Sequence, residues 1–318
     1  MKLVRSSKPR VQNLKKINLA PIMKLERYFL LLLAALAGPT YAEPRDLILV
    51  AGQSNAVGFD AYATEFIPET GDKDILFWWR VGDPPPDEFD VESGGRWTHL
   101  QPQPRGTPMD PKSADSQKKT RQYGNFKKPE GGFGPEVGLA RTLRAKEGKS
   151  PAIVKVAFSG TGLTTDWNPE DTGASGACYH ALVNETRKAI AAAQSQGTSL
   201  RLRAVVWIQG ESDATPATAP HYETNLRHML TRLRSDLEAP KLIAIVGVNT
   251  RFGNGNNPHM PQIIAAQQAL ATKDKLCFYL DTAGAETLPP SHTHFTAQGT
   301  LEIGKRAADL LLLSTTLK

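Results

Sequence analysis

The sequence predicts an α/β protein whose central parallel sheet is covered by helices on both faces. Short apolar runs alternate along the chain with longer amphipathic runs, which is the pattern of strands joined by crossover helices. Three of the apolar runs end in polar corners that contain Gly, as strands do at the ligand-binding edge of such sheets. A chain of 318 residues that is 40% hydrophobic can form one large domain or two small ones, and no linker or internal repeat divides it.

Six apolar runs are expected to be the strands of this sheet. The first covers residues 47–51, is too short for a helix and stops at Gly52. The other five lie, in chain order, at 74–81, 152–163, 202–214, 241–250 and 276–282. The third and fourth continue into the polar turns SGTG and QGESD, so they should end at the same edge of the sheet as the first.

Five amphipathic runs are expected to be helices, at 132–148, 178–197, 221–237, 260–273 and 295–313. Pro135 suits the first turn of the first of them, and Glu136 suits its positive end. Gly197 is placed to end the second helix, and Thr296 is placed to cap the last.

Residues 83–131 differ from the rest of the chain. They are rich in Pro, Gly and Lys and show no sustained period. Long segments of this kind in compact domains are usually functional or mobile, so we interpret them as a loop insertion over one edge of a site. Trp97 and Tyr123 within it either stack on a ligand or pin the loop to the body of the protein.

Residues 23–42 have the three parts of a secretory signal. A basic start precedes an apolar run at 29–37 that is too short to span a bilayer. Thr40 and Ala42 are the small residues that a signal peptidase would read. We therefore expect residues 1–42 to be a leader with a cleavable signal peptide, no stable membrane span, and a secreted or periplasmic product.

Loss of this leader would change the charge of the protein. The whole chain carries +6, but residues 1–42 hold eight Lys and Arg and one Glu. The expected mature domain, 43–318, then has 30 basic and 31 acidic residues, so no nucleic-acid partner is inferred. Export would also permit a disulfide between Cys178 and Cys277, a pairing that the sequence leaves open.

Chemically capable residues gather at one edge of the predicted sheet. The corners after the first, third and fourth strands supply Ser54, Gly160, and the pair Gln209 and Glu211. His294 precedes the last helix and can reach the same edge. Each residue alone has a purely structural explanation, such as a helix cap or a turn glycine, but their common edge favours a catalytic site.

A serine hydrolase needs a nucleophile, a base, a group that orients the base, and donors for the oxyanion. Ser54 can supply the hydroxyl nucleophile and His294 the base, and Glu211 is the best candidate for the orienting group. The backbone N–H groups of Ser54 and Gly160, with the side-chain amide of Gln209, can supply the oxyanion donors.

The motifs GQSNAVG, FGPE, VVWIQGESDA and HFTAQG make the chain similar to a known group of enzymes. Over roughly residues 45–315 it resembles the SGNH (GDSL-like) hydrolase superfamily, and within it the sialate O-acetylesterase-like branch that includes carbohydrate esterase family six, the acetylxylan esterases. The resemblance implies a flavodoxin-like three-layer α/β/α sandwich. It also implies a serine mechanism that removes acetyl esters from acetylated carbohydrates, acetylxylan or sialate, without metal or cofactor.

One position departs from the superfamily. Its members usually have Asp three residues before the catalytic His, where this chain has Ser291. The acetylxylan esterase branch implies that Glu211 is the acid, so we expect a Glu211 oxygen at a ring nitrogen of His294. His292 and His294 also form a His-x-His pair, but no third ligand lies nearby in the sequence, so no metal is predicted.

The sequence is compatible with three functions. The first is a secreted carbohydrate O-acetylesterase in which Gln53, Asn55 and Trp97 contact the substrate. The second is a lipase or thioesterase of the same superfamily, which would need an apolar acyl groove. The third is a catalytically impaired homologue that binds carbohydrate, suggested by Ser291.

Overall fold

The structure, a computed structural model, describes residues 43–83, 91–106 and 124–316. From Pro44 onward the chain forms one compact unit around a single eight-stranded sheet. The strands are β1 (Arg45–Gly52), β2 (Leu76–Gly82), β3 (Val91–Glu92), β4 (Thr98–His99), β5 (Ala152–Phe158), β6 (Leu200–Ile208), β7 (Ile243–Gly247) and β8 (Cys277–Tyr279).

The strand order places β1 near the middle of the sheet. The order is β3-β2-β5-β1-β6-β7-β8, and β4 pairs with β2. All the long strands run parallel, whereas β3 and β4 are antiparallel to β2. Because β1 pairs with β5 on one side and β6 on the other, the chain changes direction across the sheet there, which is where open α/β sheets bind ligands.

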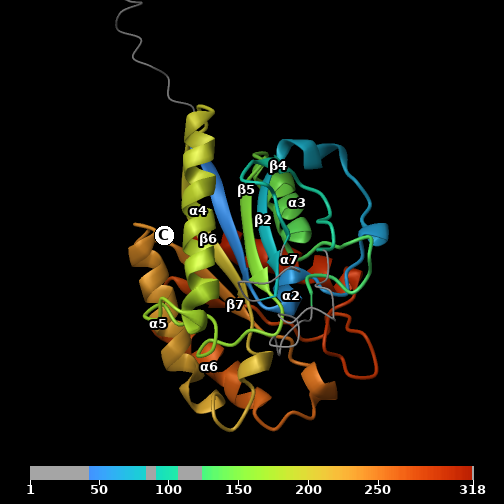
Figure 1. Ribbon diagram of the computed structural model, residues 1–318, viewed down its shortest axis with the longest axis vertical. Helices are drawn as coiled ribbons and strands as arrows, with labels where there is room; N and C mark the ends of the chain where they lie inside the picture. The colour runs from blue at the N-terminus through green and yellow to red at the C-terminus, as the bar shows by residue number, and fades with distance from the viewer. Residues whose placement is uncertain (1–42, 84–90, 107–123, 317–318) are drawn as a thin grey trace, which may run out of the picture. The chain divides into compact units, whose positions relative to one another are not determined.

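Helices cover both faces of this sheet (Figure 1). They are α2 (Ser54–Val57), α3 (Glu136–Glu147), α4 (Ala177–Ser195), α5 (Tyr222–Asp236), α6 (Met260–Lys273) and α7 (Ala297–Thr316). Side chains of α4, α5 and α6 share one core with Leu47 and Leu49, while those of α3 and α7 share the other with Ile48 and Val50. Successive side chains of β1 thus point alternately into the two cores. The predicted α/β class with helices on both faces of the sheet is confirmed.

Part of the predicted insertion packs on the body of the protein. Two-residue strands, β3 and β4, extend the edge of the sheet at β2, although no regular structure was expected in 83–131. The Trp97 indole N–H donates to the Ala189 carbonyl oxygen of α4 at 2.9 Å, and its ring meets that of Trp78 edge-on. Trp97 therefore pins the loop, which was the second of its two interpretations; Tyr123 lies outside the described residues.

Two further sequence predictions concern the cysteines and the N-terminal leader. Cys178, in α4, and Cys277, in β8, are both buried in the core that α4, α5 and α6 share with the sheet, and no disulfide joins them. The predicted leader, residues 1–42, lies outside the described part of the chain. Among the residues that the structure describes, no helix has the length and apolar character needed to cross a bilayer.

Candidate active site

The chain turns sharply between the end of β1 and Ser54. Gly52 at the end of β1 has a φ of +135°, and a Cβ there would lie 2.1 Å from a carbonyl oxygen of β6, so only Gly fits. Ser54 begins α2, which ends at Gly58 with a φ of +86°. The buried Lys155 ammonium donates to the Val57 carbonyl oxygen at 2.7 Å and ties the end of α2 to β5. Ser54 is thereby fixed at the carboxyl end of β1.

Ser54, His294 and Asp60 form a continuous hydrogen-bonded chain. His294 Nε2 lies 3.0 Å from Ser54 Oγ, and His294 Nδ1 lies 2.7 Å from Asp60 Oδ2. The ring of Phe59 packs on the imidazole with a centroid separation of 4.8 Å. With the proton of the neutral ring on Nδ1, directed at Asp60, Nε2 can accept the Ser54 hydroxyl proton, which is the division of roles in a serine-hydrolase triad.

The surroundings of Asp60 keep its carboxylate charged. Burial by itself would raise its pKa, but the hydrogen bond and charge of His294, the Tyr62 hydroxyl and the charge of Lys127 together hold the pKa below its usual value. Tyr62 donates to Asp60 Oδ1 at 2.9 Å, and Lys127 Nζ lies 3.5 Å from the same oxygen. Asp60 is therefore an anion at neutral pH, which suits a group that stabilises a positive imidazolium.

This geometry corrects the prediction that Glu211 orients His294. Glu211 Oε1 accepts from Asn55 Nδ2 at 2.7 Å and from the Asn249 backbone N–H at 3.2 Å, and Asp60 occupies the place at Nδ1. Ser291 does not fill that place either, because its hydroxyl accepts from Thr293 Oγ1 on the exposed side of the loop. The physical reason is that Gly58 turns the chain back immediately after α2, which brings a carboxylate beside His294.

The predicted oxyanion donors divide into two groups. Ser54 and Gly160 line the same pocket, whereas Gln209 does not line it and is fully buried. Gln209 Nε2 donates to the Thr161 carbonyl oxygen at 3.0 Å and to Asp213 Oδ2 at 2.6 Å, so both of its N–H groups have buried acceptors. This corrects the role predicted for Gln209, because neither N–H can turn toward an oxyanion without breaking a buried hydrogen bond.

The three predicted substrate contacts also have different positions. Gln53 lines the pocket, and its Oε1 accepts from the backbone N–H groups of Ser212 at 3.2 Å and Gly210 at 3.4 Å. Asn55 is 3% exposed and does not line the pocket, and its side chain bonds to Glu211, Thr293 and Phe295. Trp97 does not line the pocket either, since its indole N–H bonds to α4.

The pocket has a volume of about 280 Å³. Ser54, His294, Gln53 and Gly160 supply its polar side, and Phe59 and Phe252 supply aromatic walls. Within the described part of the chain, no three or more His, Cys, Asp or Glu side chains are grouped to hold a metal ion. His292 has its Nδ1 at the Thr287 hydroxyl and its Nε2 at Arg251, so the His-x-His pair does not converge on one point.

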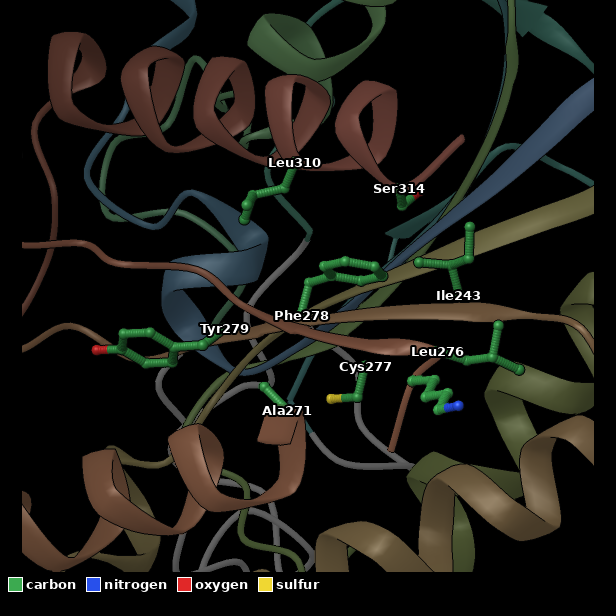
Figure 2. Close-up of a pocket in the computed structure, with 9 residues that line it drawn as sticks. Ile243, Ala271, Leu276, Cys277, Phe278, Tyr279, Leu310 and Ser314 are labelled. Carbon is green, nitrogen blue, oxygen red and sulfur yellow. The ribbon is translucent and has the colours of Figure 1, made fainter. Parts of the chain in front are cut away.

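A larger cavity, of about 600 Å³, lies beside the edge strand β8 (Figure 2). Its walls are mainly apolar: Phe278 from β8, Leu310 from α7 and Ala271 from α6. Cys277 is the one thiol in its lining, and burial together with Asp274 raises the pKa of that thiol to about 12. A thiol with this pKa stays protonated at neutral pH and is a poor nucleophile, so the smaller pocket is the candidate active site.

Sequence reasoning missed Asp60. A signal for it was present, because Asp60 stands six residues after Ser54 and two after the turn residue Gly58. The predicted acid, Glu211, follows a strand, and the position that usually holds the acid lies three residues before His294, where this chain has Ser291. The turn that ends a four-residue helix also returns side chains to the sheet edge.

Solved structures share this fold. An Arabidopsis thaliana protein is 19% identical with a TM-score of 0.61, covering 85% of this chain and 98% of its own. The structure called NanS is 18% identical with a TM-score of 0.56, covering 87% of this chain and 99% of that one. A carbohydrate acetylesterase from Xanthomonas citri is 16% identical with a TM-score of 0.50, covering 83% and 54%. At these identities the likeness establishes the fold.

The family is established at the level of sequence. No curated protein matches the chain. The family described as carbohydrate esterase, sialic acid-specific acetylesterase matches residues 44–313, which is most of the chain and includes both Ser54 and His294. The chain therefore belongs to this carbohydrate esterase family and is a hydrolase that acts on esters.

Proposed function

We propose that this protein is a serine O-acetylesterase that removes acetyl groups from esterified carbohydrates, with Ser54, His294 and Asp60 as its triad. The observation that carries the proposal is the unbroken series of hydrogen bonds from Ser54 Oγ through His294 to Asp60, at the wall of the pocket. Membership of the carbohydrate esterase family supports the substrate class.

The first half of the reaction would transfer the acetyl group to the protein. Ser54 Oγ attacks the ester carbonyl carbon while His294 Nε2 takes the hydroxyl proton. Asp60 accepts the Nδ1–H hydrogen bond and stabilises the imidazolium. His294 then gives the proton to the sugar oxygen as the carbon–oxygen bond breaks, and the alcohol leaves acetyl-Ser54 behind.

The second half would repeat these steps with water. His294 Nε2 takes a proton from water, the hydroxide adds to the acetyl carbonyl carbon, and the proton returns to Ser54 Oγ as acetic acid leaves and ionises to acetate. In both halves the negative charge develops on the carbonyl oxygen, next to the backbone N–H groups of Ser54 and Gly160. No group besides these residues and water is needed to balance the steps.

The size of the pocket supports a short acyl group. Its volume of about 280 Å³ is below the roughly 300–1,000 Å³ of sites that enclose drug-sized ligands. A long-chain lipase would need an extended apolar groove that continues from the nucleophile. The larger apolar cavity beside β8 does not include the triad among its walls, so it gives no such continuation.

The structure removes the argument for the third hypothesis, that the protein is an inactive homologue which only binds carbohydrate. That hypothesis depended on Ser291 standing where the superfamily has Asp. Since Asp60 supplies a charged carboxylate at 2.7 Å from His294 Nδ1, the missing Asp does not leave the base without a partner.

Acetate release from a small panel of esters tests the proposal. The panel contains O-acetylated sialic acid, acetylated xylo-oligosaccharides, and p-nitrophenyl acetate and octanoate. We expect acetate from at least one acetylated sugar and little hydrolysis of octanoate. Preferred hydrolysis of octanoate would support the hypothesis that the protein is a lipase. Binding of the sugars without acetate release would support the hypothesis that it is an inactive carbohydrate-binding homologue.

We also propose that Gln53, rather than Gln209, is the third oxyanion donor. Gln53 Oε1 accepts from two backbone N–H groups, which fixes the orientation of the side-chain amide. Its Nε2 therefore points away from these two groups, and it has no hydrogen-bond acceptor among the described residues. Gln53→Ala should lower kcat by about 10²–10³ with little change in KM, since the interaction strengthens in the transition state.

The matched control for Gln53 is Gln209→Ala. That change opens a buried network in which Gln209 also accepts from the Tyr222 hydroxyl, so it should lower the melting temperature more than Gln53→Ala does. A higher KM with unchanged kcat in Gln53→Ala would make Gln53 a ground-state binding residue instead.

Export is a further part of the proposal and depends on residues 1–42. If the leader is a signal peptide, the exported protein should begin at or near Glu43. N-terminal sequencing of protein recovered from the periplasm or medium measures this. A product that keeps residues 1–42 would contradict the export proposal and leave the esterase proposal untouched.

A further inference from the structure

We propose that Glu211 is a positioning residue that holds the base in place through Asn55 and Asn249. The segment it positions is residues 292–295, called here the His294 loop. The proposal deepens the function proposed above and rests on it. Its basis is a set of buried and partly buried hydrogen bonds that connect Glu211 to the backbone on both sides of His294.

Asn55 joins the nucleophile turn to the His294 loop. Its Nδ2 donates to the Thr293 carbonyl oxygen at 3.1 Å, and its Oδ1 accepts from the Phe295 backbone N–H at 3.1 Å. These contacts lie immediately before and after His294. Since Asn55 follows Ser54 in the chain, one side chain sets the spacing between the nucleophile and the base.

Asn249 holds the same loop from the end of β7. Its Nδ2 donates to the carbonyl oxygens of His292 at 2.8 Å and Thr293 at 3.1 Å. Its Oδ1 accepts from the Arg251 backbone N–H at 3.0 Å, which fixes the direction of the amide. Asn249 is 1% exposed, and its three side-chain hydrogen bonds are partly buried.

Glu211 joins the two asparagines at a single oxygen. Its Oε1 accepts from Asn55 Nδ2 at 2.7 Å and from the Asn249 backbone N–H at 3.2 Å. This acceptor forces Asn55 to point its N–H₂ group toward Glu211 and Thr293, and its oxygen toward Phe295. Glu211 Oε1 thus reinforces the amide orientation that the Thr293 carbonyl oxygen and the Phe295 N–H also require, and it fixes the position of Asn55 against the end of β7.

The remaining oxygen of Glu211 argues against a direct chemical role. Glu211 Oε2 is buried and has no hydrogen-bond partner among the described residues, although the residue lines the pocket. Glu211 is 4% exposed, and burial raises the pKa of its carboxyl. Its role as an acceptor at Oε1 needs no negative charge, whereas a triad acid needs one to stabilise the imidazolium.

Two substitutions separate an acceptor from a charge. Glu211→Gln keeps an oxygen for Asn55 and Asn249, and Glu211→Leu removes it while keeping the bulk. Displacement of a catalytic group by about 1 Å can cost about 10²-fold in rate. We therefore expect kcat to fall less than tenfold in Glu211→Gln and about 10²-fold in Glu211→Leu, with KM changed little in both.

A third variant covers the case in which Glu211→Leu does not fold. Asn249→Ala removes the two contacts to the loop but leaves the backbone N–H that Glu211 accepts, and it should lower kcat to a similar extent. Adding Glu211→Leu to Asn249→Ala should then cost less than the product of the single effects, because both act on the same loop. Equal inactivation by Gln and Leu at Glu211, or unchanged kcat in Asn249→Ala, would overturn the proposal.

A spectroscopic readout keeps this test independent of the esterase proposal. The His294 Nδ1 proton that bonds to Asp60 should give a resolved downfield proton resonance in the wild type and in Glu211→Gln. It should be lost or shifted in Glu211→Leu and Asn249→Ala, because the loop is no longer held; an unchanged resonance in both would overturn the proposal. If the wild type hydrolyses no ester, the proposed function fails while this readout still decides the position of His294.

Discussion

Ser54→Ala is expected to lower kcat by about 10⁶-fold, which is the effect of deleting the nucleophile of a serine hydrolase. Ser54 Oγ is the atom at hydrogen-bond distance from His294 Nε2, so its loss leaves the base without a nucleophile to activate. The hydroxyl lies at the wall of the pocket, and its removal leaves the cores on both faces of the sheet unchanged. Acetate release at saturating substrate measures kcat, and thermal unfolding checks the fold.

The pocket itself supplies matched controls for this result. Ser159 and Ser212 also line it, but neither hydroxyl is hydrogen-bonded to His294. A serine-directed fluorophosphonate should label Ser54 in the wild type, in Ser159→Ala and in Ser212→Ala, and should label nothing in Ser54→Ala. Label on Ser159 or Ser212 would place the nucleophile elsewhere in the pocket.

Asp60→Asn should lower kcat by about 10⁴-fold, as in related triads where the orienting carboxylate becomes an amide. The amide retains the shape of Asp60 but presents no charge to the imidazolium. It can also donate to Nδ1, which favours the wrong tautomer of His294. Because the pKa of Asp60 lies below its usual value, the wild-type carboxylate remains ionised through the neutral and weakly acidic range. Any loss of activity between pH 7 and 5 should therefore come from another group.

Three substitutions at nearby residues serve as controls for Asp60→Asn. Tyr62→Phe removes the hydroxyl that donates to Asp60 Oδ1 but leaves the contact with His294, so its effect should be much smaller. Ser291→Ala should be nearly silent, since the Ser291 hydroxyl bonds to Thr293. If Asp60→Asn keeps most of the wild-type kcat while Glu211→Gln loses it, Glu211 is the acid after all.

Most of the fold could be predicted because it depends on local pattern. Each of the six predicted strands overlaps a strand of the structure, and each of the five predicted helices overlaps a helix. The alternation of apolar runs and amphipathic runs needs only neighbours in sequence to be read. The short strands β3 and β4 were not predicted, because a two-residue strand has no periodicity and owes its pairing to β2.

The site was predicted less completely than the fold. A strand that ends in Gly-Gln-Ser indicates where a hydroxyl will lie, and a His before the last helix can reach the same edge. The sequence does not indicate which of several polar groups at that edge will bond to which. Glu211, Asp213 and Asp60 all lie near that edge, and Gln53 and Gln209 are both amides that flank its strands.

The sequence by itself thus determined the α/β class, the family and the edge of the sheet where Ser54 and His294 lie, since these depend on periodicity and motif. The tertiary structure decided the partners: Asp60 for His294, Asp213 for Gln209, and Asn55 with Asn249 for Glu211. The physical reason is that His294 and Asp60 are 234 positions apart, and a hydrogen bond depends on distances of tenths of an ångström. The tertiary contacts of the His294 loop with Asn55, Asn249 and Asp60 set those distances.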